Sequence, residues 1–144
     1  MALINRSNPA TAVMRAVARR REALTHDLKI GKHHLTADEP QAQGGQDMGP
    51  SPQELLAASL ASCTAVTMEM YADRKGWNVE GLEVDCTYAP AERGCPTRFE
   101  LVMRMPAHLS EEQVERLQVI AAKCPVHRTL EGEVAFDERV ELTN

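Results

Sequence analysis

The pattern of apolar and polar positions predicts a long, unusually apolar helix in the middle of the chain. Ser51 can cap it, Pro52 suits its first position, and Glu54 sits where a capping-box carboxylate reaches back. The following residues are almost uniformly apolar as far as Met70, and Gly76 fits the site just past the helix end. A helix with so small a polar face must be covered on nearly all sides.

A second helix is predicted between Ser110 and Cys124. Ser110 followed by Gln113 forms a capping box, and apolar residues then recur at helical spacing. Pro125 comes next, and the residue before a proline is disfavoured in the helical conformation. We therefore expect this helix to end at Cys124, which places the cysteine in its last turn.

Strict alternation of apolar and polar residues predicts short strands around the two helices. Residues 28–37 indicate one hairpin, and residues 82–88 and 99–105 indicate a second. The alternation in residues 134–142 favours a final strand or hairpin. Two helices and five or six strands indicate an α+β fold with an antiparallel sheet and helices on one face.

The N-terminal segment lacks such a pattern. Residues 12–23 are rich in Ala, Val and Arg without a clear helix cap, so we interpret residues 1–26 as an irregular or helical arm before a single domain at residues 27–144. One sheet cannot cover the whole apolar surface of the first helix. The simplest way to bury the rest of this surface is contact with a second copy of the chain, which predicts a homodimer.

Charge and composition exclude several classes of partner. A net charge of -5 disfavours nucleic acid and anionic membrane surfaces, because both need a dense basic patch. No uninterrupted run of eighteen apolar residues occurs, and residues 1–23 carry arginines where a signal peptide needs an apolar core. We expect a cytoplasmic protein, in which cysteines stay reduced unless a disulfide is part of the chemistry.

Two of the four cysteines lie on the predicted helices. Cys63 shares a helix face with apolar residues, where simple core packing is the plain alternative to chemistry. Cys63 and Cys124 can be bridged if their Cα atoms come within about 7 Å. At the negative end of a helix, Cys124 is expected to hold its proton more tightly unless Lys123, His127 or Arg128 offsets this effect. Cys63 is then the better nucleophile if a cation is supplied.

The other two cysteines have structural interpretations. Cys86 alternates with apolar residues in a predicted strand, which is a core setting, and Cys95 lies in a turn where its thiol is exposed. Zinc is the competing use of Cys and His. Cys124 and His127 form only a single pair of possible ligands, so we expect no metal site and no cofactor.

Residues 44–64, which include Cys63, and residues 120–130, which include Cys124, resemble the two cysteine motifs of the OsmC/Ohr hydroperoxide-reductase family. The similarity extends from about residue 27 to residue 142. It implies an OsmC-like fold, with two long helices packed on curved antiparallel sheets in an intertwined homodimer. It also implies active sites at the dimer interface.

The resemblance further implies an oxidoreductase of the oxidative stress response, an antioxidant peroxidase that reduces organic hydroperoxides. Cys63 would become a sulfenic acid, and Cys124 would resolve it as a disulfide, with a dithiol of the lipoyl type as reductant. The family also uses a Glu from the head of the first helix and an N-terminal Arg. Here Gln53 follows the proline, so Glu54 is the candidate, either as a catalytic residue or only as a helix cap.

The activating cation has four candidates, and the substrate tail needs an apolar pocket. The candidate arginines are Arg15, Arg19, Arg20 and Arg21. We expect Leu60, Met68 and Met70 to line the pocket. The alternative function is a dimeric, redox-sensitive protein that binds a hydrophobic small molecule without turnover.

Overall fold

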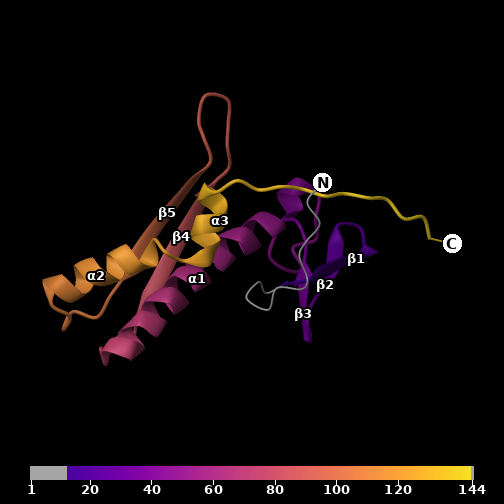
Figure 1. Ribbon diagram of the computed structural model, residues 1–144. Coiled ribbons are helices and arrows are strands. Elements are labelled where there is room, and N and C mark those ends of the chain that lie inside the picture. The colour runs from indigo at the N-terminus through magenta and orange to yellow at the C-terminus, as the bar shows by residue number, and fades with distance from the viewer. Residues whose placement is uncertain (1–12, 144) are drawn as a thin grey trace. The chain divides into compact units, whose positions relative to one another are not determined.

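The computed structural model describes residues 13–143, which form two compact units (Figure 1). The first unit contains the described residues up to Pro52 together with the C-terminal segment from Val134, and the second contains residues 53–133. The beginning of the predicted N-terminal arm, residues 1–12, lies outside the described residues.

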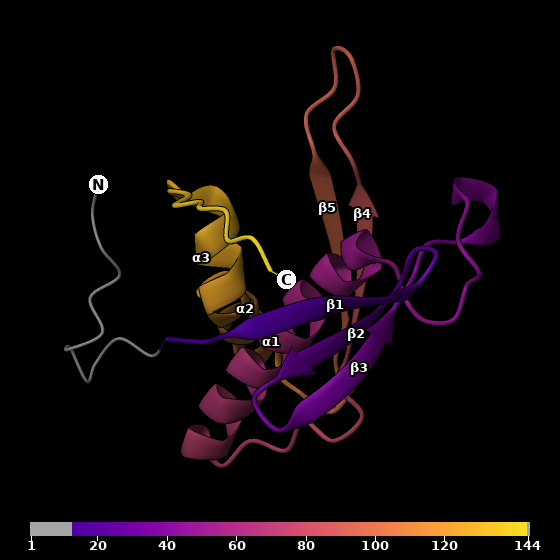
Figure 2. The same cartoon turned by 90° about the vertical axis from the view of Figure 1, so that its right-hand side faces the viewer.

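The first unit is built on a three-stranded antiparallel sheet, seen in Figure 2. Its strands are β1 (Ala16–Glu22), β2 (Thr25–Ile30) and β3 (His33–Ala37), and β2 lies in the middle. The predicted hairpin in residues 28–37 is therefore confirmed. The expected boundary between arm and domain, after residue 26, falls inside β2.

The expectation of an irregular or helical segment at residues 12–23 is wrong for residues 16–22, which form β1. Contacts across the strands decide this. Arg21 Nη2 donates to Asp27 Oδ1 on β2 at 2.6 Å and to Thr36 Oγ1 on β3 at 3.1 Å. Because such cross-strand pairs outweigh the intrinsic helix preference of Ala and Arg, the local sequence misleads here.

A buried aspartate fastens the loop that leads from β3 to the first helix. Asp38 is 1% exposed and accepts hydrogen bonds from Thr25 Oγ1 at 2.8 Å and from the backbone N–H groups of Glu39 at 2.7 Å and Met48 at 3.3 Å. Burial acts to raise the pKa of Asp38, but these donors outweigh it and lower the pKa below its ordinary value. A short 3-10 helix, η1 (Gln41–Gln43), lies within the loop.

The second unit is an α+β arrangement in which helices and a hairpin share one core. Its elements are α1 (Pro52–Lys75), β4 (Glu83–Ala89), β5 (Arg98–Arg104), α2 (Glu111–Ala121) and α3 (Pro125–Glu131). Met68 and Ala72 from α1 pack with Leu117 and Ala121 from α2 at the centre of this core. Residues facing the helices from β4 and β5 complete it, among them Val84 and Met103.

Helix α1 begins and ends where the sequence predicted. Gly76 has φ 70°, its N–H donates to Asp73 O at 3.2 Å, and Trp77 N–H donates to Ala72 O at 2.9 Å. This pair of bonds is a Schellman motif, which satisfies the last carbonyls of the helix and needs a left-handed residue at the glycine position. Local capping signals therefore determine the length of α1.

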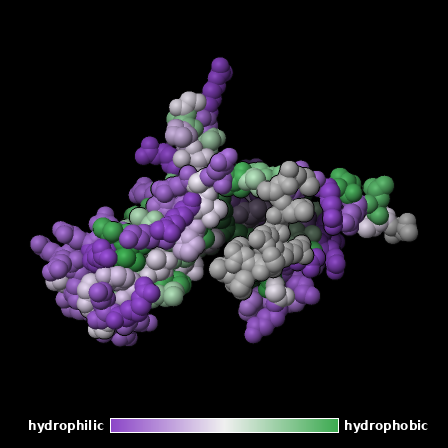
Figure 3. All heavy atoms as spheres, in the orientation of Figure 1, coloured by the Kyte–Doolittle hydropathy of each residue, from purple (hydrophilic) through white to green (hydrophobic). Residues whose placement is uncertain are grey.

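Much of α1 is uncovered in a single chain. Its buried residues form one stripe with a spacing of four, namely Leu60, Thr64, Met68 and Ala72. By length and composition alone α1 could cross a membrane, but core helices of water-soluble proteins meet the same criterion. In a single chain, 22% of the most apolar stretch of α1 is buried. Val66 and Met70 are 46% and 58% exposed, and apolar side chains are visible among the hydrophilic surface in Figure 3.

The predicted second hairpin is also confirmed. Strands β4 and β5 pair in antiparallel register, with Cys86 opposite Leu101, and one face of each strand is half-buried. Cys86 lies on that face, where burial raises the pKa of its thiol. Cys95 is exposed near the tip of the hairpin, as the turn signals indicated.

The start of α2 is as predicted, but its end is not. Ser110 Oγ accepts from Gln113 N–H at 3.1 Å, and Gln113 Oε1 accepts from Ser110 N–H at 2.9 Å, which is a capping box. The helix ends at Ala121, so the placement of Cys124 in its last turn is wrong. Cys124 is instead the N-cap of α3, because Pro125 occupies the first position of a new helix.

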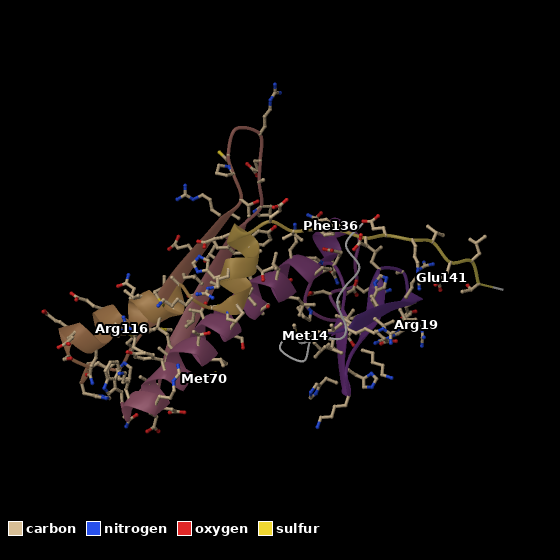
Figure 4. All side chains as sticks on the ribbon, viewed as in Figure 1. Met14, Arg19, Met70, Arg116, Phe136 and Glu141 are labelled. Atoms are coloured by element: carbon tan, nitrogen blue, oxygen red, sulfur yellow. The ribbon has the colours of Figure 1, made fainter. Side chains whose placement is uncertain are left out.

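The final strand predicted in residues 134–142 is absent from the described structure, and this prediction is wrong for a single chain. The alternating apolar residues there find no strand edge to pair with. Phe136, labelled in Figure 4, is 80% exposed, and Val140 and Leu142 are 87% and 94% exposed. A strand-like pattern forms a strand only when a neighbouring edge supplies its hydrogen bonds.

Candidate active site

Cys63 lies in the middle of α1 and is only partly buried. Its carbonyl oxygen accepts a hydrogen bond from Thr67 Oγ1 at 2.7 Å, one turn further along. The side chain is therefore carried by a regular helix and keeps a part of its surface open to solvent.

Cys124 is completely buried at the start of α3. Its N–H donates to Ala121 O at 3.2 Å and its carbonyl oxygen accepts from Arg128 N–H at 3.0 Å, so the backbone is fixed on both sides. The sulfur receives the backbone N–H groups of Val126 and His127, the second and third residues of α3. A helix N-terminus offers such free donors because they have no partner within the helix.

Cys63 and Cys124 lie close enough for each thiol to shift the pKa of the other. Burial raises the pKa of Cys63, and the neighbouring Cys124 raises it further. Burial also acts to raise the pKa of Cys124, but the Cys63 thiol and the N–H groups of α3 outweigh burial and lower it below its ordinary value. The neighbourhood thus raises the pKa of Cys63 and lowers that of Cys124 within one coupled pair.

This polarity reverses the expectation from the sequence. Cys124 was expected to keep its proton because a helix C-terminus is electronegative. The structure places it at an N-terminus, where N–H donors stabilise a thiolate. The error follows directly from interpreting Pro125 as a helix terminator.

His127 follows Cys124 by three residues, and the sequence offered it as a possible metal ligand and as a possible cation beside Cys124. Its Nε2 lies 2.8 Å from Glu131 Oε1, one turn further along α3. Its Nδ1 is buried without a hydrogen-bond partner among residues 13–143. If Nε2 carries the proton that it shares with Glu131, Nδ1 has a free lone pair. The spacing of four residues between His127 and Glu131 was the sequence signal for this contact.

Glu54 is not brought to the thiol pair within one chain. It is exposed in the first turn of α1 and precedes Cys63 by nine residues. That separation corresponds to about 13 Å along the axis and two and a half turns, which places the two side chains on opposite faces of the helix. A role for Glu54 at a thiol pair therefore requires the pair of another chain.

The four candidate arginines belong to the first unit and differ in their contacts. Arg21 is paired with Asp27 at 2.6 Å, and Arg20 Nε donates to Ala23 O at 3.0 Å. Arg15 and Arg19 are exposed. Because the guanidinium of Arg21 is already held by a carboxylate, it is the least suited of the four to stabilise a thiolate.

The substrate pocket expected from Leu60, Met68 and Met70 does not exist in that form. Leu60 is 2% exposed and Met68 is completely buried, and Met68 packs against Leu117 in the core. Met70 is 58% exposed on another face of α1, as Figure 4 indicates. Helical spacing alone could not separate core residues from surface residues, because nearly every position of α1 is apolar.

Metal chemistry finds no support in the arrangement of side chains. Within the described part of the chain, no group of three or more His, Cys, Asp or Glu side chains is placed to hold a metal ion. All four cysteines are free thiols.

The candidate site is therefore a pair of neighbouring thiols, one on a partly exposed residue and one on a residue buried at a helix N-terminus. The chain belongs to the OsmC-like protein family, whose profile matches residues 44–139 and so covers both cysteines. No curated protein matches the chain significantly in sequence.

Solved structures agree on the fold. An OsmC-like protein from Mycoplasma pneumoniae has a TM-score of 0.71 at 20% identity, over 84% of this chain and 89% of that chain. An organic hydroperoxide resistance protein from Elizabethkingia anophelis has a TM-score of 0.66 at 19% identity, over 87% and 92% of the two chains. The organic hydroperoxide resistance protein OhrB of Bacillus subtilis has a TM-score of 0.58 at 21% identity, over 84% of this chain and 92% of that chain. The predicted OsmC-like α+β fold is confirmed.

Proposed function

We propose that this protein is a thiol peroxidase that reduces organic hydroperoxides through Cys63 and Cys124. The observation that carries the proposal is the proximity of two cysteines, one partly exposed and one buried, whose thiols each shift the pKa of the other. Family membership adds support, since the similar structures include organic hydroperoxide resistance proteins.

Exposure assigns the attack on peroxide to Cys63. A peroxide can reach the partly exposed sulfur of Cys63, whereas Cys124 is completely buried. Attack begins when the proton of Cys63 moves to the neighbouring Cys124 thiolate. The Cys63 thiolate then forms a bond to the terminal peroxide oxygen, and the O–O bond breaks. Cys63 becomes a sulfenic acid, and the leaving alkoxide takes the proton from Cys124 to give an alcohol.

The second step, in which Cys124 resolves the sulfenic acid, uses the lowered pKa of Cys124. Having given up its proton, Cys124 is a thiolate stabilised by the N–H groups of Val126 and His127. It attacks the Cys63 sulfur, the S–S bond forms, and hydroxide leaves and is protonated by solvent. An external dithiol, of the lipoyl type that the family resemblance implies, then reduces the disulfide by thiol exchange.

The active enzyme is proposed to be a cytoplasmic homodimer. The supporting observations are the exposed apolar residues of α1, the unpaired strand-like segment after residue 133, and the free thiols, which suit a reducing compartment. In such a dimer Glu54 of one chain would serve the thiol pair of the other. The proposal assigns no metal, cofactor, nucleic acid or membrane partner.

Rapid mixing with cumene hydroperoxide tests the assignment of the two roles. Cys63→Ser protein should consume no peroxide, and Cys124→Ser protein should react once per chain and stop at a sulfenic acid that a dimedone-type reagent traps. Cys95→Ser is the matched control, because this exposed thiol lies at the hairpin tip, and it should react like the wild type. Undiminished consumption by Cys63→Ser protein would refute the assignment.

A second function is favoured by one observation, the raised pKa of Cys63, which slows attack on peroxide. The protein would then be a redox-sensitive dimer that binds a hydrophobic small molecule without turnover. Repeated cycles of peroxide consumption with a dithiol present would exclude this alternative. A single slow oxidation without cycling would support it.

A further inference from the structure

A cavity of about 900 Å³ lies between the end of α1 and one face of α2, within the second unit. Tyr71, Lys75 and Trp77 line it from one side, and Arg116 and Val119 of α2 line it from the other. Cys63 precedes Tyr71 by two turns of α1, so the cavity is separate from the thiol pair. Its lining combines aromatic rings, an aliphatic surface and two cations.

The aromatic part of the cavity is rigid. Tyr71 and Trp77 pack edge to face, with ring centroids 5.7 Å apart and an interplanar angle of 67°. Both side chains are half-buried, so each keeps surface open toward the cavity. The Schellman motif at Gly76 fixes the backbone between them. A planar apolar body can therefore bind here without first ordering the walls.

Two cations converge on the ring of Tyr71. Lys75 Nζ lies 5.6 Å from the ring centroid and Arg116 Cζ lies 5.5 Å from it. Arg116 Nε also donates to Tyr71 Oη at 2.9 Å, which fixes the plane of the guanidinium. In the described part of the chain, no carboxylate forms an ion pair with Lys75 or Arg116. The terminal N–H groups of Arg116, labelled in Figure 4, therefore remain available for an anion.

The charge of the lining limits the kind of anion. Glu112 and Glu115 also line the cavity, so its formal charge is close to neutral. A ligand with several phosphate charges would be repelled by these carboxylates, whereas a single carboxylate can pair with the fixed guanidinium. The hydrogen bond from Arg116 lowers the pKa of Tyr71.

We propose that this cavity is a binding site for a small aromatic monocarboxylate, with the carboxylate on Arg116 and Lys75 and the ring against Trp77 and Val119. This site is independent of the peroxidase proposal and uses neither Cys63 nor Cys124. The protein would thus carry a ligand site on the unit that also holds its dithiol.

Tryptophan fluorescence reports on this site directly, because Trp77 is the only tryptophan in the chain. Benzoate added at millimolar concentration to the full-length protein should change the emission of Trp77 saturably, and benzamide, which has the same shape without the charge, should not. Calorimetry of the same titrations checks the result if the emission is insensitive. Absence of saturable benzoate binding by both methods, or equal binding of benzamide, would overturn the proposal.

Two variants locate the binding. Arg116→Gln should weaken benzoate binding about tenfold or more, the loss expected for a charged hydrogen bond, and Lys75→Gln should weaken it less. Arg93→Gln, at the tip of the β4–β5 hairpin, is the matched control and should bind like the wild type. Circular dichroism shows whether each variant is folded, and Lys75→Gln replaces Arg116→Gln in the test if the latter is not. Unchanged affinity in a folded Arg116→Gln or Lys75→Gln protein would contradict the assignment.

Discussion

Cys63 on α1 and Cys124 at the N-terminus of α3 are neighbours, and each thiol shifts the pKa of the other. Two residues distant in sequence thus form one ionisable pair, in which one partner is accessible and the other is supplied with N–H donors. Neither sulfur alone has both properties that a peroxidase needs. The accessible Cys63 and the more acidic Cys124 can act together, because a proton can move between the two neighbouring thiols.

The first prediction concerns the titration of the pair. Cys63→Ala removes a donor to the Cys124 thiolate, so the pKa of Cys124 should rise and its thiolate should appear at higher pH than in the wild type. Cys124→Ala removes a neighbour that raises the pKa of Cys63, so that pKa should fall. Thiolate absorbance near 240 nm measures both, in a background where Cys86 and Cys95 are replaced by Ser.

Opposite shifts in the two variants are the signature of a coupled pair. Cysteines that are merely buried near one another, without a hydrogen bond, would shift in the same direction when the neighbour is replaced by a small apolar residue. Parallel shifts, or none, would therefore contradict a pairing in which Cys63 stabilises the Cys124 thiolate.

The second prediction tests the core of the second unit. Leu117 is completely buried against Met68 and Ala72, so Leu117→Ala should lower the free energy of unfolding by about 3 kcal/mol, within the usual range for such a cavity. Val119, two residues further along α2, is 52% exposed, and Val119→Ala should change it by less than about 0.5 kcal/mol. Urea unfolding followed by circular dichroism compares the two, and similar losses would mean that α2 packs with a different face.

The third prediction concerns acid stability and Asp38. Since its pKa is lowered in the folded protein, ionised Asp38 contributes stability that is present above the unfolded value of about 4 and is lost as pH falls through the folded value. Asp38→Asn protein should melt at a lower temperature than the wild type near pH 7. The difference between them should shrink below about pH 4. A difference that stays constant down to pH 2 would show that the charge of Asp38 does not contribute.

The fourth prediction concerns assembly through α1. Val66 and Met70 are exposed on one face of the helix in a single chain, and a dimer would bury them. Light scattering should give twice the chain mass of 15.9 kDa for the wild type, and Val66→Glu should give the single-chain mass. Val102→Glu, at a β5 position that is 41% exposed, is the control and should remain a dimer. A monomeric wild type, or a dimeric Val66→Glu protein, would refute this interface.

Residues that start and end helices made the second unit largely predictable. Ser51 with Pro52, the glycine at position 76, and the capping box of Ser110 and Gln113 each act within a few residues, and the structure has α1 and the start of α2 where they indicated. The alternation in β4 and β5 was equally decisive, because one face of that hairpin is covered by the helices. Elements that depend on neighbours in sequence, or on one clear buried face, can be predicted from sequence.

The failures have the opposite cause. Strand β1 forms because Arg21 reaches Asp27 and Thr36 on two other strands, and no pattern within residues 16–22 shows this. Pro125 is compatible both with ending a helix and with starting one, and the choice between them determined the predicted acidity of Cys124. The segment after residue 133 has the pattern of a strand but no edge to pair with in a single chain. Each case depends on a contact that the local sequence does not encode.

The most direct test of the account is the bond formed when peroxide meets the reduced protein. One equivalent of cumene hydroperoxide is added to the wild type, free thiols are blocked at once, and peptides are analysed by mass spectrometry without reduction. The account predicts rapid and nearly complete linkage of the Cys63 peptide to the Cys124 peptide, while the peptides of Cys86 and Cys95 carry the blocking group. Blocked Cys63 and Cys124, or a disulfide that joins either of them to Cys86 or Cys95, would contradict it.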